Sequence, residues 1–151
     1  MAHIVSIVYR PKGTRRPQDR YERVPADRVQ LIETWGIEGD KKGSKTKRQL
    51  NVLHAELLAE LGNEGFKVGP GEMGEQIVVA GIDPVAMVPG ARLKLRDAVI
   101  EVAELRTGCA RFEMIQGRPR GDVKGRLGVI AVVVTGGEVA VGDAVEVLPA
   151  E

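Results

Sequence analysis

Short runs of β-branched and aliphatic residues, separated by glycine and proline, constrain the fold of this chain more than any other feature. The 151 residues include 19 glycines and 8 prolines, which interrupt the apolar runs at short intervals. Five runs are typical of strands, at residues 4–9, 76–79, 92–96, 99–105 and 128–135. The chain between them is too short for regular βαβ crossovers, so we expect mostly antiparallel pairing.

Closure is the way in which a mostly antiparallel sheet removes its exposed edges. We therefore predict a mainly β protein, built as a closed or nearly closed β-barrel with one or two short helices outside it. The length fits one domain with a substantial core, and no low-complexity stretch divides the chain, so we predict a single domain over residues 1–151.

The C-terminal part predicts a β-hairpin. Residues 128–135 are nearly all aliphatic, which indicates a strand buried on both faces, and Gly136 and Gly137 supply a two-residue turn. The valines that follow keep a period of two, as a returning strand would: Val139, Val141, Val145 and Val147.

One segment departs from the β pattern. Leu53, Leu57 and Leu61 recur every four residues, which is typical of the apolar face of a helix. Asn51 can serve as the N-cap, and Gly62 stands where a helix commonly ends. We therefore predict a short amphipathic helix that packs on the sheet.

The composition excludes several classes of function. With 22 Lys and Arg against 21 Asp and Glu the net charge is +1, and aromatic residues make up only 3%, so nucleic-acid binding is not expected. No apolar run is long enough for a membrane span, and the first residues lack a signal-peptide pattern, so we expect a cytoplasmic protein. Basic residues concentrate at 10–28, 41–48 and 106–126, where they would form an anion site if the three stretches converge.

The single cysteine, Cys109, is the most chemically suggestive residue. It lies between Arg106 and Arg111, and nearby cations favour the thiolate, the form that attacks sulfur electrophiles or binds a soft metal. The alternative is that Cys109 is a small buried apolar residue, as most free cysteines are. His3 and His54 are widely separated and do not indicate a zinc site.

Six separated segments carry a recognisable series of motifs. In order they are GIEGD at 36–40, RQL at 48–50, PGEMGEQ at 70–76, RTGCAR at 106–111, RLG at 126–128 and GGEVAVGD at 136–143. This series resembles the MOSC domain, the module named for the C-terminal part of molybdenum cofactor sulfurase and also found in small stand-alone bacterial proteins. The resemblance runs from about residue 35 to residue 148.

The resemblance implies both a fold and a site. MOSC domains resemble the β-barrel first described in the inserted domain of pyruvate kinase, and they use a cysteine to carry sulfur or to ligate molybdenum in a pterin cofactor. By position, this resemblance makes Cys109 the catalytic residue and the molybdenum ligand. It implies a cofactor-binding pocket around that sulfur, formed by Asp40, Arg48, Gly74, Glu75, Gln76, Arg106 and Arg111.

The sequence departs from the family pattern at three places near this site. Gly108 stands where proline often precedes the cysteine, Lys41 and Lys42 follow the Gly-Asp pair where histidine is common, and Gln76 replaces an asparagine. The lysines keep a cation while losing a possible base, and Gln76 keeps an amide.

The resemblance implies that the protein binds molybdenum cofactor, or carries a persulfide on Cys109 for delivery to a metal centre. Its partners would be a cysteine desulfurase or another sulfur donor, and a sulfur-accepting metalloenzyme. Pyridoxal phosphate belongs to a separate domain of the larger sulfurases and is not expected to be bound here. Two alternatives are a non-catalytic module that binds an anionic partner through its basic loops, and a component of a molybdenum-dependent reductase of N-hydroxylated compounds.

Overall fold

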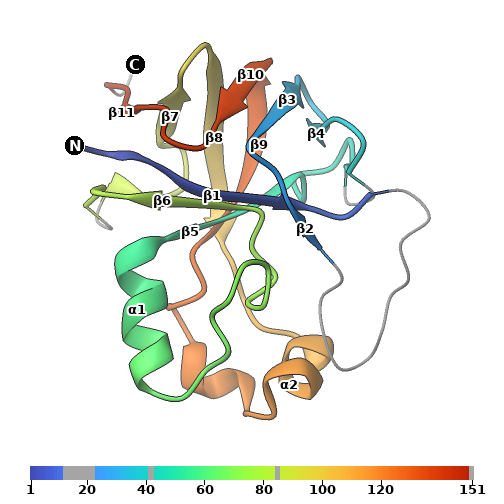
Figure 1. Cartoon of the computed structure of the whole chain (residues 1–151), viewed down its shortest axis with the longest axis vertical. Coiled ribbons are helices and arrows are strands. Elements are labelled where there is room, and N and C mark those ends of the chain that lie inside the picture. The colour runs from blue at the N-terminus through green and yellow to red at the C-terminus, as the bar shows by residue number, and fades with distance from the viewer. Residues whose placement is uncertain (12–22, 41–42, 84–85, 150–151) are drawn as a thin grey trace.

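A computed structural model describes residues 1–11, 23–40, 43–83 and 86–149. Strands dominate the order of elements along the chain (Figure 1). The elements are β1 (His3–Tyr9), β2 (Val24–Pro25), β3 (Arg28–Ile32), β4 (Gly36–Ile37), β5 (Leu50–His54), α1 (Ala55–Asn63), β6 (Ile77–Ala80), β7 (Arg92–Leu95), β8 (Ala98–Leu105), α2 (Ala110–Gln116), the 3-10 helix η2 (Arg120–Val123), β9 (Val129–Thr135), β10 (Gly137–Ala140) and β11 (Val145–Val147).

Eight strands form one curled sheet in the order β11-β7-β8-β9-β5-β6-β1-β2, and a second sheet has the order β10-β3-β4. Among the described strands β5 and β6 pair in parallel, while the other pairs are antiparallel. Main-chain hydrogen bonds bring the ends of the large sheet together, from Ile4 N–H to the Asp143 carbonyl (2.9 Å) and from Val145 N–H to the Ala2 carbonyl (3.0 Å). The prediction of a mainly β, nearly closed barrel is therefore confirmed.

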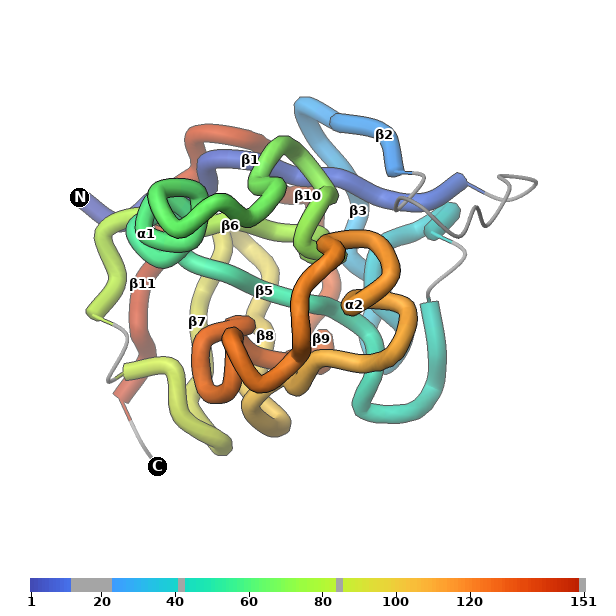
Figure 2. Tube along the Cα trace, turned by 90° about the horizontal axis from the view of Figure 1, so that it is seen from below, coloured from blue at the N-terminus to red at the C-terminus, as the bar shows by residue number. Residues whose placement is uncertain are grey.

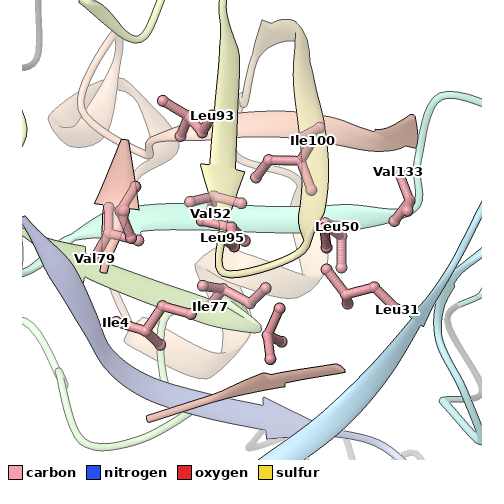
Figure 3. Close-up of a cluster of buried hydrophobic side chains, with 14 of the residues drawn as sticks. Ile4, Leu31, Leu50, Val52, Ile77, Val79, Leu93, Leu95, Ile100 and Val133 are labelled. Carbon is pink, nitrogen blue, oxygen red and sulfur yellow. The ribbon is translucent and has the colours of Figure 1, made fainter. Parts of the chain in front are cut away.

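Aliphatic side chains fill the inside of the curled sheet (Figure 3). In β8 the buried residues Ala98, Ile100 and Val102 alternate with less buried ones, because successive side chains of a strand point to opposite faces. Residues 129–131 of β9 are all buried, as predicted for a strand covered on both faces.

A second apolar cluster lies beneath the barrel, where α1, α2 and the connection between α1 and β6 come together (Figures 1 and 2). The buried members of this cluster are Leu53, Leu57, Leu61, Phe66, Met73, Phe112, Val123 and Leu127. This cluster positions the segment that carries Cys109.

Among the described residues no helix has the length and apolar character to cross a membrane.

The predicted helix begins later than its leucine spacing indicated. Residues 50–53 are all buried in strand β5, which lies between β6 and β9 and continues to His54, so α1 begins only at Ala55. Asn51 is therefore not an N-cap; its side chain is buried in the sheet. The spacing of Leu53, Leu57 and Leu61 does mark one apolar face, because all three belong to the second cluster although Leu53 comes from the strand.

The predicted hairpin is wrong. Strand β10 does not return along β9 but pairs with β3, with Val139 opposite Val29, and β11 pairs with β7. At Gly136 a Cβ would lie 2.8 Å from the Leu31 carbonyl oxygen, so glycine lets the chain cross closely over β3. The two glycines therefore mark a crossing into the second sheet rather than a hairpin turn.

Candidate functional site

A glycine-rich turn between α1 and β6 forms the centre of the candidate site. It contains Gly74, Glu75 and Gln76, three of the residues that the family resemblance singled out. Gly71 (φ 80°) and Gly74 (φ 77°) adopt left-handed backbone conformations, which glycine reaches without steric cost. The positions of these two glycines thus fix the path of the turn.

The Glu75 carboxylate points back into its own turn. It accepts hydrogen bonds from the N–H groups of Gly71 (2.7 Å) and Met73 (3.1 Å), and the residue is 1% exposed. Burial raises the pKa of this carboxyl group, against the opposing effect of its main-chain hydrogen bonds and of Arg23. Glu75 therefore acts as an internal brace that occupies two amide groups of the turn.

Two side chains, one from β5 and one from the residue after β8, hold carbonyl groups of this turn. Arg106, which follows β8, is buried and donates to the Met73 carbonyl (2.7 Å). Asn51 of β5 donates to the Gly74 carbonyl (2.9 Å). Both contacts replace the strand-to-strand bonds that this irregular backbone cannot form.

Two further residues complete this bracing. Gln116, the last residue of α2, is buried and donates to the Glu72 carbonyl (2.9 Å). Arg23 donates to the carbonyls of Gly74 (2.8 Å) and Glu75 (3.1 Å). The turn is thus tied to α2, to the end of β8, to β5 and to the residue before β2.

Asp40 and Gln76 form a second buried pair beside the turn. Gln76 Nε2 donates to Asp40 Oδ2 (2.6 Å), and its Oε1 accepts from the Asn51 N–H (2.6 Å). Asp40 also accepts from the Arg10 N–H (3.0 Å). The structure brings these two predicted residues together as a structural link; the departure at residues 41 and 42 lies outside the described residues.

Cys109 lies at the start of α2 and is exposed. The alternative interpretation of Cys109 as a buried apolar residue is therefore wrong. Its carbonyl accepts the Glu113 N–H (3.1 Å), and the helix that it begins is anchored on the glycine-rich turn through Gln116. Because Arg106 precedes Cys109 by three residues and also holds the turn, the main chain is held to the turn on both sides of Cys109.

The predicted arginines occupy different environments. Arg106 is 8% exposed and directed at the Met73 carbonyl, Arg111 is half-buried on α2, and Arg48 is exposed in the segment before β5. The structure thus joins Arg106 to the turn, while none of the hydrogen bonds described above reaches Arg48.

Three arginines of the basic stretch at 106–126 are paired with nearby carboxylates. Ion pairs join Arg118 to Asp122 (3.5 Å), Arg120 to Glu113 (2.9 Å), and Arg126 to both Glu60 (3.3 Å) and Glu64. These pairs reduce the positive field that an anion-binding module would use.

The residues fit only part of a molybdenum pterin cofactor. The exposed thiol of Cys109 suits a soft metal. The amides of Gly71 and Met73, which could otherwise hold a phosphate, are taken by Glu75. Among the described residues no group of three or more His, Cys, Asp or Glu side chains is arranged to hold a metal ion. Glu75 also lines a groove of about 190 Å³ between β1 and α1, and Cys109 is not part of its lining.

Sequence reasoning missed four residues that shape the site: Asn51, Gln116, Arg23 and Arg120. Gln116 had a usable signal, since it lies among apolar residues of a short helix and next to Gly117, which ends that helix with φ 69°. The partners of Asn51, Arg23 and Arg120 lie far away along the chain or depend on the packing of η2, so no local pattern indicates them.

Comparisons with known proteins agree with this architecture. The family model described as the MOSC domain matches residues 40–146. The structure is similar to that of YiiM from Escherichia coli (19% identity, TM-score 0.73, covering 99% of this chain and 71% of that one). It is also similar to YuaD from Bacillus subtilis (19%, 0.76, 97% and 96%) and to YiiM from Geobacillus stearothermophilus (16%, 0.75, 99% and 76%). No curated protein matches the chain. At these identities the structural similarities establish the fold alone.

Proposed function

This chain belongs to the MOSC domain family, and from that premise we propose that it carries sulfur as a persulfide on Cys109 and delivers it to a metal centre in another protein. The family is linked to molybdenum cofactor binding and to sulfur transfer. The observation that supports carriage most strongly is the exposure of Cys109 at the start of α2, where a partner can reach it.

Loading the sulfur is an exchange between two sulfur centres. The Cys109 thiolate attacks the terminal sulfur of a donor persulfide, such as the one formed on a cysteine desulfurase. A new S–S bond forms at Cys109, the S–S bond of the donor breaks, and the donor cysteine leaves as a thiolate. The exchange needs no external oxidant, because the sulfur moves with its oxidation state unchanged.

Delivery repeats the exchange in the other direction. A thiolate of the accepting metalloenzyme attacks the terminal sulfur, so that the acceptor now carries the persulfide and Cys109 leaves as the thiolate. Release of this sulfur to the metal centre as sulfide takes two electrons, which a second thiol supplies by forming a disulfide with the acceptor cysteine. Both steps require an incoming thiolate to approach the sulfur in line with the bond that breaks. An exposed sulfur permits this approach between two folded proteins, whereas a buried one would not.

Binding of molybdenum cofactor is the second candidate, favoured by the same exposed thiol. When bound, the cofactor would supply a metal centre for oxygen-atom or electron transfer. Cys109 would hold the metal, and side chains would have to hold the phosphate, because Glu75 occupies the turn amides. Elemental analysis for molybdenum in protein purified from a host that makes the cofactor tests this candidate.

Mass spectrometry tests sulfur carriage. The protein is incubated with a cysteine desulfurase and cysteine, repurified, and analysed as the intact chain beside the Cys109→Ser variant. The parent should gain the mass of one sulfur atom and lose it on mixing with an acceptor thiol, while the variant gains none. A parent mass that stays unchanged by this treatment, as the mass of the variant should, would overturn the proposal.

A further inference from the structure

A groove beside β7 lies apart from the candidate site. Its volume is about 540 Å³, which is within the range of small-molecule pockets. The segment before β7, the paired strands β7 and β8 and the residues after β11 form its lining. These strands lie at the opposite end of the molecule from α2 (Figure 1), so a ligand of this groove would not contact Cys109.

The floor of the groove is a row of residues on adjacent strands. Arg92 of β7 lies opposite Glu101 of β8, and the Leu148 N–H, directly after β11, donates to the Arg92 carbonyl (2.9 Å). Residues opposite one another on paired strands point to the same face of a sheet. Here it is the outer face, because the neighbouring Leu93 is part of the barrel core.

Arg92 and Glu101 bring unused hydrogen-bonding groups to this floor. Arg92 Nε donates to Glu101 Oε1 (2.9 Å), and this contact orients both side chains. Within the part of the chain that the structure describes, no hydrogen bond uses the two Nη atoms of Arg92 or Oε2 of Glu101. The two side chains are 39% and 35% exposed. The floor therefore offers a guanidinium group and a carboxylate group side by side.

The rest of the lining is mainly apolar. The N–H groups of Gly90 and Ala91 are taken by the carbonyls of Val102 and Val88, so the main chain of this wall offers few donors to a ligand. Val88 is also 49% exposed, which leaves apolar surface open. The apolar lining residues are Val88, Pro89, Ala91, Leu148 and Pro149.

From this arrangement we propose that the groove binds a free α-amino acid with a large apolar side chain. The α-carboxylate accepts from the Nη groups of Arg92, the α-ammonium donates to Oε2 of Glu101, and the side chain packs on the apolar wall. An α-amino acid carries both of its charges on one carbon, so it matches two opposite charges that are held side by side. This site goes beyond the proposed sulfur carriage and does not depend on it.

Titration at low salt, followed through the amide chemical shifts of isotope-labelled protein, tests the proposal. L-phenylalanine should shift the signals of residues 88–92 and 148. It should bind about two- to fivefold more tightly than phenylpropanoate, which lacks the ammonium, or phenethylamine, which lacks the carboxylate, because each partly exposed charge contact contributes modestly. Glycine should bind more weakly than phenylalanine, because it has no apolar side chain to bury.

Two variants assign each preference to its charge. Glu101→Gln should remove the preference for phenylalanine over phenylpropanoate, and Arg92→Gln should remove the preference over phenethylamine. Lys94→Gln is the matched control, because Lys94 is an exposed cation of β7 that does not line the groove. It should keep both preferences, and unchanged core signals show that each variant is folded.

Three results would overturn the proposal. One is a parent protein that binds phenylpropanoate or phenethylamine as tightly as phenylalanine. Another is the absence of shifts at the groove at the highest soluble concentration of phenylalanine, and the third is that both preferences persist in Arg92→Gln and Glu101→Gln. None of these results involves Cys109, so this site and sulfur carriage stand or fail separately.

Discussion

The strands of the barrel and the segments beneath it both bury apolar side chains, but the hydrogen-bonding groups of their main chains find partners in different ways. In the barrel, ladders such as the one between β8 and β9 pair the main chain with itself. Around the glycine-rich turn, side chains supply the partners: Arg106 for the Met73 carbonyl, Asn51 for Gly74 and Gln116 for Glu72.

This difference explains where the buried polar residues lie. The buried polar or charged side chains of the described residues are Asp40, Gln49, Asn51, Glu75, Gln76, Arg106 and Gln116. Six of them brace the glycine-rich turn or link it to the neighbouring strands, whereas the Gln49 side chain joins the Thr46 carbonyl to the Val133 N–H. The main chain of the glycine-rich turn is irregular, and burying such backbone requires these side-chain partners.

The largest loss of stability should come from a cavity in the core of the barrel. Ile100→Ala removes a fully buried side chain at the centre of the sheet (Figure 3) and should lower the free energy of unfolding by roughly 2–5 kcal/mol. Chemical denaturation measures the loss. The Cys109 alkylation rate of the remaining folded protein should match that of the parent, and a large change would show that barrel and site are not separate.

Removing one set of side-chain hydrogen bonds beneath the barrel should lower stability less, and the change should stay local. Gln116→Leu leaves the Glu72 carbonyl and the Lys67 main chain without their side-chain partner, at a cost of about 1–3 kcal/mol. Hydrogen exchange should speed up in residues 69–76 while the strands β8 and β9 keep their protection. Exchange that becomes equally faster in the turn and in β8 and β9 would contradict the claim that Gln116 stabilises the turn alone.

The smallest effect concerns the pH dependence that Glu75 adds to stability. Burial raises its pKa in the folded protein above the ordinary value of 4.5. Its stabilising contribution is therefore complete below pH 4.5 and is lost as the pH rises through the raised pKa. Glu75→Gln stays neutral, so the parent should lose stability relative to this variant as the pH rises from below 4.5 towards neutrality.

Urea denaturation of both proteins at a series of pH values measures this difference. Ile100→Ala serves as the control, because its difference from the parent should not change with pH. A gap between the parent and Glu75→Gln that stays constant, or that moves in the parent's favour as the pH rises, would contradict the burial of Glu75.

The strands and the barrel could be predicted from the sequence because alternation and glycine spacing are local signals. The pairing of β10 with β3 could not, since Val139 and Val147 continue the period of two across a change of sheet. Asn51 illustrates the same limit: its position before a leucine stripe indicates a cap, yet burial between two strands overrides that preference.

The candidate site was predictable in part. The motifs indicated Cys109 and the turn at 70–76, but they gave no sign that Glu75 faces inward or that Arg120 is bound to Glu113. These contacts depend on how α2 and η2 pack on the turn. Gly108 illustrates this dependence on packing, because a Cβ there would lie 2.9 Å from Arg120 Cβ, a contact that no local sequence pattern indicates.

The central claim is that the exposed Cys109 at the end of the barrel carries sulfur. The most direct measurement is peptide mapping of the protein after reaction with a cysteine desulfurase and isotopically labelled cysteine, with free thiols and persulfides blocked before digestion. We expect the labelled sulfur on the peptide that contains Cys109, in a form released by a reducing agent. Labelled sulfur absent from that peptide, while the desulfurase remains active, would contradict the claim.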